Sequence, residues 1–178
     1  TPTGTNVSVD SEDKRIGAGS LHLNGQSYLT IAGEDGDNLL VGRDQLTFSF
    51  WCKNQVDGNN NWVFFASKND ENNSPNQEHY IGLTLRDTIT FERWNNSGTR
   101  APVVSAAGVT NTAWNYVTVV MDEKSSQLYV NGEKRNGLDD QARLADILTA
   151  GSKLHLGKAN WGGGEYYKGW IDEFTIYD

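Results

Sequence analysis

The chain has 178 residues, enough to bury one hydrophobic core, which predicts a single domain. Its formal net charge of -8 argues against a nucleic-acid partner and an acidic membrane surface, because both need clustered Lys and Arg, and no apolar run approaches the roughly 18 to 20 residues that span a bilayer. Nineteen glycines, three prolines and 11% aromatic residues fit strands joined by many turns rather than a disordered chain.

The first part of the chain alternates short strand-like runs with turns. Residues 6–9 are a candidate edge strand. Residues 20–23 and 28–31 are strand-like and flank an Asn-Gly dipeptide, which predicts a hairpin. Residues 33–44 are rich in Gly and Asp and predict a loop.

The central part of the chain has the patterns of paired strands. Residues 46–51 alternate with period two, and residues 62–66 are nearly all apolar, as in a central strand. Residues 80–85 and 88–94 predict a hairpin around Arg86-Asp87. Its buried face is expected to carry Ile81, Leu83, Leu85, Ile89 and Phe91. Its other face is expected to carry Tyr80, Gly82, Thr84, Thr90, Glu92 and Trp94.

The last part completes a chain made almost entirely of strands. Residues 114–121 and 126–130 are expected to pair, and residues 138–148 hold the one plausible helical turn. Short strands follow at 154–156 and 174–176. About a dozen short strands with regularly spaced turns, undivided by any linker, predict an all-β, two-sheet antiparallel β-sandwich or jelly roll.

Five segments in order resemble the laminin-G-like, concanavalin A-like jelly rolls. They are residues 19–31, 46–51, 114–120, 128–132 and 169–177. The resemblance runs from about residue 17 to the end, and it implies a single laminin-G-like module over residues 1–178. Since this fold serves many functions, the fold alone does not assign one.

Two further segments, residues 91–100 and 157–162, are similar to the laminin-G-like carbohydrate-binding modules of bacterial plant-polysaccharide hydrolases. The nearest likeness is to the family 61 modules, which implies a β-1,4-galactan or arabinogalactan ligand. The resemblance also implies a monomeric, secreted module excised from a larger multidomain enzyme, with polysaccharide as its partner and neither nucleic acid nor membrane.

A sugar site needs aromatic rings that stack on C–H faces, and planar amides, carboxylates or Arg that pair with hydroxyls. Loops and strand ends supply such groups, and the candidate residues are Trp94, Asn95, Asn96, Arg100, Asn160 and Trp161. Trp62 and Tyr80 could extend the aromatic platform, and Lys68 or Arg93 could donate hydrogen bonds. Arg93 has the parity of the buried face, so a structural Arg paired with a carboxylate is the alternative.

The remaining tryptophans have simpler interpretations. Trp51 and Trp114 lie in the shared fold pattern and are expected in the core, and Trp170 is expected to pack beside the closing strand. For Trp62 the sequence does not decide between a place in the core and a place in the sugar site. The single cysteine, Cys52, follows a strand-like run and is expected to be a buried free thiol.

A catalytic role finds little support. A retaining glycosidase needs two carboxylates about 5 Å apart, and no Glu-x-Asp-x-x-Glu run is present. Asp172 and Glu173 are adjacent and would point to opposite faces of a strand, and Glu92 has no carboxylate two residues away. The three histidines make no metal-ligand spacing. We therefore expect no catalytic residue.

Modules of the resembled kind often carry a structural Ca²⁺ held by oxygen ligands. By resemblance Asp172 is the best candidate ligand, with Asn24 of the Asn24-Gly25 turn as a second. Such an ion would stabilise the fold; the alternative is that Asp172 only caps a turn.

The sequence thus favours a non-catalytic carbohydrate-binding module that holds a glycoside hydrolase on plant cell-wall polysaccharide. The alternatives are an extracellular adhesion or protein-interaction domain and, third, a glycan-active enzyme.

Overall fold

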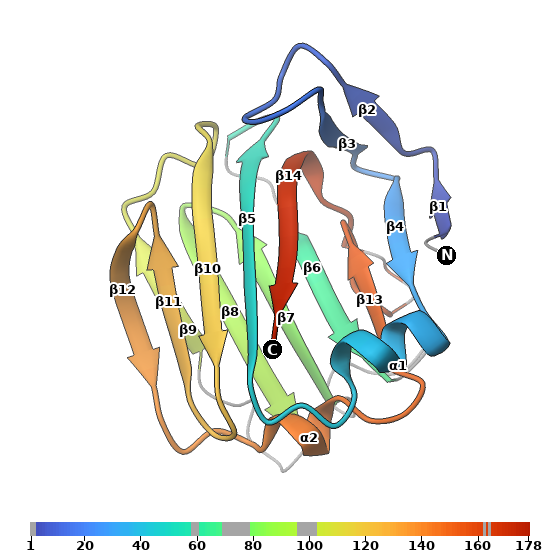
Figure 1. Ribbon diagram of the computed structural model, residues 1–178. Coiled ribbons are helices and arrows are strands. Elements are labelled where there is room, and N and C mark those ends of the chain that lie inside the picture. The colour runs from blue at the N-terminus through green and yellow to red at the C-terminus, as the bar shows by residue number, and fades with distance from the viewer. Residues whose placement is uncertain (1–2, 58–60, 69–78, 96–102, 162, 164) are drawn as a thin grey trace.

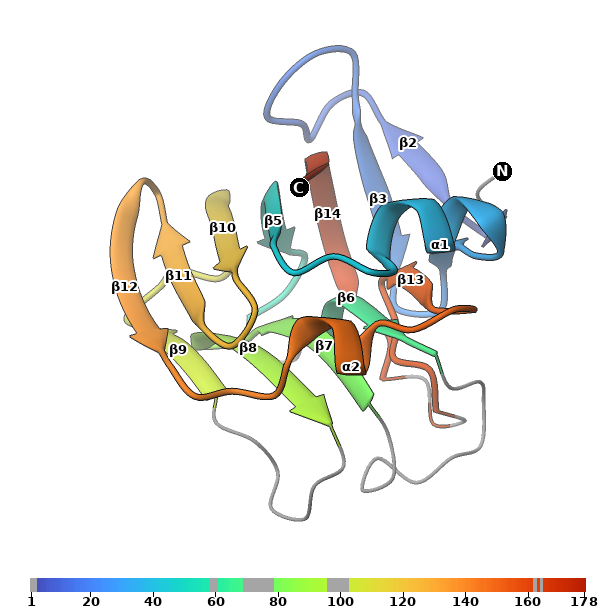
Figure 2. The ribbon, with the colours of Figure 1, turned by 60° about the horizontal axis from the view of Figure 1, so that its bottom comes forward.

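Two seven-stranded antiparallel sheets stack face to face in the computed structural model, which describes residues 3–57, 61–68, 79–95, 103–161, 163 and 165–178 (Figures 1 and 2). In order, sheet A contains β1 (Thr3–Thr5), β4 (Tyr28–Ile31), β13 (Lys153–Leu156), β6 (Trp62–Ser67), β7 (His79–Leu85), β8 (Thr88–Asn95) and β9 (Val103–Ala107). Sheet B contains β12 (Glu133–Leu138), β11 (Ser126–Val130), β10 (Asn115–Met121), β5 (Leu46–Asn54), β14 (Lys168–Tyr177), β3 (Ser20–Asn24) and β2 (Ser8–Asp10). The predicted β-sandwich is confirmed.

Two short helices lie at the same end of the sandwich, at the bottom of Figure 1. The helical turn expected within residues 138–148 is α2 (Leu144–Ile147). The loop expected at residues 33–44 is wrong in its first part, which forms α1 (Glu34–Leu40). Leu40 is buried in the core, and Gly36 packs so closely on Ser152 that a Cβ would lie 2.5 Å from its carbonyl oxygen. Neither helix is long and apolar enough to cross a membrane.

The hairpin expected around Asn24-Gly25 is also wrong. β3 pairs with β14 in sheet B, whereas β4 pairs with β13 in sheet A. The Gly25 N–H donates to the carbonyl of Tyr167 at 3.1 Å, so the turn is anchored to the loop before β14. The Asn-Gly dipeptide here carries the chain from one sheet to the other.

The core lies between the inner faces of the sheets. Phe48 and Phe50 of β5 contact Phe64 of β6 and Phe174 of β14, with ring centroids 5.0 to 5.8 Å apart. The five inner-facing residues expected on the β7–β8 hairpin are all fully buried, which confirms the predicted register. Each such side chain contributes roughly 1.5 to 3 kcal/mol by leaving water.

Arg93 of β8 also points inward and is fully buried. Its guanidinium donates hydrogen bonds to the backbone carbonyls of Asp122 (2.9 Å), Ser125 (2.9 Å) and Glu123 in the β10–β11 turn. Arg93 therefore has the structural role that the sequence left as the alternative, but its hydrogen bonds go to backbone carbonyls, and the Asp122 carboxylate adds a coulombic attraction. Burial lowers the pKa of Arg93 to about 10, so the side chain stays charged at neutral pH.

The turn that joins β2 to β3 is fastened onto the outer face of sheet B. Asp13 accepts a hydrogen bond from the indole N–H of Trp114 (3.2 Å) and forms an ion pair with Lys53 (2.6 Å). The Arg15 guanidinium lies 4.4 Å from the ring centroid of Trp51, at a distance typical of cation–π contacts. The turn and sheet B therefore stabilise one another.

The expectation that Trp51 and Trp114 belong to the core is wrong, because both are half-buried beneath this turn. Alternation along β5 points Phe50 into the core and therefore points Trp51 outward. Trp170 packs on the same outer face as expected, stacked on His22 at 5.0 Å.

Replacing Arg93 with Met is expected to lower the free energy of unfolding by about 2 to 4 kcal/mol, because three carbonyls at the turn each lose the hydrogen bond from the buried guanidinium. Urea denaturation followed by tryptophan fluorescence measures this. Arg135→Met on edge strand β12, where the side chain is exposed, is the control and should change stability by less than about 0.5 kcal/mol. Equal effects of the two variants would contradict the assigned role.

Asp10 predicts a pH dependence. Hydrogen bonds from the Asp13 N–H, the Trp170 indole and the Glu12 N–H lower the pKa of Asp10 from 3.8 to about 2. A lowered carboxyl pKa stabilises the fold above pH 3.8, and this contribution is lost as the pH falls toward 2. The melting temperature of Asp10→Asn should therefore lie below that of wild type at neutral pH. This difference in melting temperature should disappear as the pH falls from 4 to 2. The exposed Asp139→Asn is the control, and a constant difference for Asp10→Asn would refute the expectation.

Candidate functional site

A second apolar cluster lies on the outer face of sheet A. It contains Trp62, Phe65, Tyr80, Trp94 and Ala159, and Trp161 packs against it. Tyr80 stacks on Phe65 at 4.6 Å and meets Trp94 edge-on at 5.5 Å. We call this set, with Trp161, the aromatic platform. Sheet A is therefore packed on both faces near the middle.

The strands place these rings by two local rules. Tyr80 and Trp94 face each other across β7 and β8, and alternation puts both opposite to inner-facing Ile81. On β6 a bulge shifts the register between Trp62 and Phe64. Two residues between Trp62 and Phe65 therefore point to the core, and both Trp62 and Phe65 reach the outer face.

Gly82 makes room for the ring of Trp62. A Cβ at position 82 would lie 2.6 Å from Cζ3 and 2.7 Å from Cε3 of Trp62. No real Cβ tolerates such contacts, so the indole can lie over β7 only because position 82 has no side chain.

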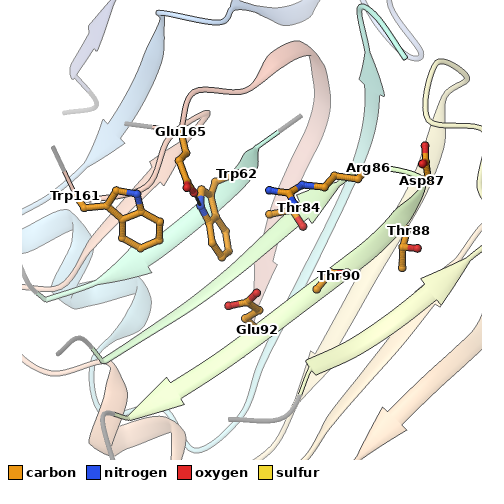
Figure 3. A pocket seen from close by; sticks show the side chains of 9 residues that line it. All are labelled: Trp62, Thr84, Arg86, Asp87, Thr88, Thr90, Glu92, Trp161 and Glu165. Carbon is orange, nitrogen blue, oxygen red and sulfur yellow. Dashed lines mark hydrogen bonds between the residues drawn. The ribbon is translucent and has the colours of Figure 1, made fainter. Parts of the chain in front are cut away.

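A cavity of about 510 Å³ opens beside the aromatic platform (Figure 3). Trp62 and Trp161 form its aromatic wall, with rings nearly perpendicular and centroids 5.7 Å apart. Trp62 is only 2% exposed, whereas Trp161 is half-buried and has accessible ring surface. The polar lining consists of Thr84, Arg86, Asp87, Thr88, Thr90, Glu92 and Glu165.

Two carboxylates hold rings of the platform in place. Glu165 accepts a hydrogen bond from the Trp62 indole N–H at 2.6 Å, and Glu92 accepts one from the Tyr80 hydroxyl at 2.6 Å. Arg86 extends from the end of β7 toward Thr84 (Figure 3). The lining thus has three carboxylates and one guanidinium, so its net charge is negative at neutral pH.

The structure brings together four residues that the sequence proposed for the site: Trp62, Tyr80, Trp94 and Trp161. Asn160 is buried beside them, and its amide donates to Ser67 Oγ at 3.0 Å.

The other candidates are placed differently. Asn95 is the last residue of β8 and pairs with His79, and Lys68 is exposed just beyond β6. Arg93 faces the core, so its assignment to a sugar site is corrected to a structural role. Asn96 and Arg100 lie outside the described residues.

Sequence reasoning missed most of the polar lining. Thr84, Thr90 and Glu92 were assigned to the outer face of the hairpin without a role in the site. Arg86 and Glu165 lie in a turn and a glycine-rich loop, where no periodicity predicts their direction. Only the tertiary arrangement places them beside Trp62.

The residues proposed for Ca²⁺ do not fit one ion. Asn24 lies opposite Lys168 in the pairing of β3 with β14, and Asp172 is four residues farther along β14. At a strand rise of about 3.3 Å per residue, Asp172 is therefore about 13 Å from Asn24. Asp172 instead accepts the backbone N–H groups of Arg15, Ile16 and Glu173, which closes the turn before β3. Over the described residues, no three His, Cys, Asp or Glu side chains are grouped as metal ligands.

Cys52 is buried in the core as expected, and burial raises the pKa of its thiol far above the usual range. A thiol held protonated in this way is a poor nucleophile, so Cys52 has a packing role.

Gly82→Ala is expected to lower the free energy of unfolding by about 1 to 3 kcal/mol, because Trp62 must move away from the new methyl group. Near-ultraviolet circular dichroism should change as the indole loses its fixed position. Gly137→Ala in β12 is a matched control, since a Cβ there meets its nearest atom at 3.5 Å. Gly82→Ala with wild-type stability and spectrum would contradict the packing argument.

Comparisons with known proteins agree with this architecture. Domain 4 of AbnA, a GH43 extracellular arabinanase from Geobacillus stearothermophilus solved in complex with arabinotriose, is 23% identical with a TM-score of 0.69; the match covers 100% of this chain and 81% of that one. The Ruminococcus gnavus IT-sialidase CBM40 bound to α2,3-sialyllactose is 19% identical with a TM-score of 0.67, covering 98% and 91%. Domains LG4-5 of the mouse laminin α1 chain are 14% identical with a TM-score of 0.64, covering 88% and 40%. These likenesses show the fold.

No curated protein sequence matches the chain. The model of the Laminin_G_3 family, described as the concanavalin A-like lectin/glucanases superfamily, matches residues 23–178. This match covers most of the chain, which therefore belongs to the Laminin_G_3 family.

Proposed function

We propose that the chain is a non-catalytic carbohydrate-binding module that targets an attached glycoside hydrolase to plant cell-wall polysaccharide. The observation that carries the proposal is the cavity beside Trp161, which combines an accessible indole ring with hydroxyl, carboxylate and guanidinium groups. Sugars are recognised by this combination, since the ring stacks on C–H groups and the polar groups pair with hydroxyls.

The structural neighbours support a glycan ligand. The arabinanase domain was solved with arabinotriose, and the sialidase module with sialyllactose. An extracellular, bacterial setting and an attached hydrolase belong to the same proposal. By tethering, such a module would raise the local concentration of substrate around the enzyme.

The carboxylates support binding rather than catalysis. Glu92 and Glu165 each accept a short hydrogen bond from an aromatic side chain of the platform. These bonds fix Trp62 in the cavity wall and Tyr80 in the aromatic platform next to it. A role as general acid would instead need a carboxyl group that is free to reach a glycosidic oxygen.

The negative charge of the cavity beside Trp161 favours an uncharged glycan over an acidic one. Three carboxylates against one guanidinium disfavour uronic and sialic acids, because their carboxylates would be repelled. A neutral glycan fits better, and β-1,4-galactan or a related pectic side chain such as arabinan is our best candidate.

Affinity electrophoresis in gels containing galactan, arabinan, arabinogalactan, xylan or polygalacturonate tests the proposal. Retardation is expected on a neutral pectic side chain and not on polygalacturonate. Trp161→Ala should lose about 2 kcal/mol of binding, or roughly 30-fold in affinity, because the stacking ring is removed.

Trp51→Ala is the matched control, since Trp51 is also half-buried but lies on the outer face of sheet B. It should keep wild-type retardation. Undiminished binding by Trp161→Ala would show that the site is wrong, and a wild-type protein retarded by none of the polysaccharides would refute the function.

A further inference from the structure

A second cavity, also about 510 Å³, opens at the sandwich edge near the start of β14. The β3–β4 turn, the residues before β6 and the loop before β14 form it. Its lining includes Asn24, Gln26, Asn61, Glu165, Tyr166 and Lys168. We call it the rim cavity, and the cavity beside Trp161 the face cavity. Glu165 lines both.

A ridge of two short paired segments separates the cavities. Trp62 and Tyr166 form an isolated parallel bridge, and the Trp62 N–H donates to the carbonyl of Glu165 at 3.4 Å. The Asn61 amide donates to the carbonyl of Tyr166 at 3.3 Å. Consecutive residues of an extended segment point to opposite sides, so Trp62 lines the face cavity and Asn61 the rim cavity.

Glu165 lies at the join of the two cavities. One carboxylate oxygen accepts the Trp62 indole N–H at 2.6 Å, which fixes the side chain toward the face cavity. The residue is nevertheless exposed, and a carboxylate has about four lone-pair sites. Glu165 can therefore accept hydroxyl hydrogens from a ligand while it holds Trp62.

The rim cavity repeats the chemistry of the face cavity. Tyr166 supplies a half-buried aromatic ring, whose centroid lies 6.1 Å from that of Tyr28. Asn24 and Gln26 are exposed amides that can donate and accept at once, as neighbouring sugar hydroxyls require. A volume of about 510 Å³ lies within the range of about 300 to 1,000 Å³ that is typical of small-molecule sites.

We propose that the two cavities are subsites of one site, and that a linear neutral glycan passes over Glu165 from Trp161 to Tyr166. The module then recognises several consecutive sugars rather than a single one. This inference rests on the proposed function, because it takes the ligand of the face cavity to be a glycan.

Isothermal titration calorimetry with β-1,4-galacto-oligosaccharides from the disaccharide to the hexasaccharide tests it, with α-1,5-arabino-oligosaccharides as a second series. We expect affinity to rise with length and one hexasaccharide to bind per protein. Tyr166→Ala and Gln26→Ala should each weaken hexasaccharide binding by about 5- to 10-fold and change disaccharide binding by less than about twofold. Trp161→Ala should weaken binding at every length.

Tyr177→Ala is the matched control, because Tyr177 is exposed at the opposite end of β14 and should leave all affinities unchanged. Thermal melting checks that each variant is folded. If Tyr166→Ala has a lowered melting temperature, the test of the rim cavity rests on Gln26→Ala, because Gln26 is exposed and its replacement should not affect folding. Two hexasaccharides per protein, affinities independent of length, or rim variants that bind the hexasaccharide like wild type would each overturn the single extended site while leaving the function intact. Failure of wild type to bind any oligosaccharide would defeat the proposed function as well.

Discussion

Sheet A is packed on both of its faces, and this constraint decides which residues can serve the site. On β7 and β8 the inward positions are filled by the hydrophobic core and by Arg93, and the outward residues Tyr80 and Trp94 belong to the aromatic platform. These two strands add only polar side chains to the cavity lining, namely Thr84, Thr88, Thr90 and Glu92, so the half-buried ring of the cavity wall has to come from a loop. Trp161 and Glu165 therefore come from the segment between β13 and β14.

The β13–β14 segment joins the two layers of the molecule. β13 belongs to sheet A and β14 to sheet B, so the segment must cross the edge of the sandwich. Its pairing with the start of β6 fixes it there, through the bridge between Trp62 and Tyr166. The site is thus set by contacts between residues about one hundred positions apart, and it depends on the completed fold.

Period-two patterns in the sequence were enough to predict most strands and, for the β7–β8 hairpin, the buried face, but they did not predict β1, β9 or β12. They were not enough to choose pairing partners: the Asn24-Gly25 dipeptide marks a turn, but the hydrogen bond from Gly25 to Tyr167 decides that the turn changes sheets. Nor could they separate the core from a packed outer face, which is why Trp51 was misassigned. The alternation of β5 is correct, but the cover over its outer side comes from the distant Arg15.

The candidate site divides in the same way. Its aromatic half could be predicted, because large rings next to Gly and Asn residues are conspicuous in a sequence. Its polar half could not, because Arg86 and Glu165 have no periodic pattern that fixes their direction. The sequence also proposed Arg93 on chemical type alone, whereas its parity placed it in the core.

Adjacent residues of β8 show how such a module can diversify. Arg93 ties the inner layer to the β10–β11 turn, while its neighbour Glu92 faces the cavity. Mutations at the outward polar positions Thr84 and Thr90 can therefore alter ligand preference with little effect on the core. Trp62 has no such freedom, because its ring fits only over a residue without a side chain, Gly82, and its indole N–H donates to Glu165. Over evolutionary time the aromatic platform should persist while the polar lining of the cavity changes, so that, under the proposed function, related modules share the platform and differ in the sugars they bind.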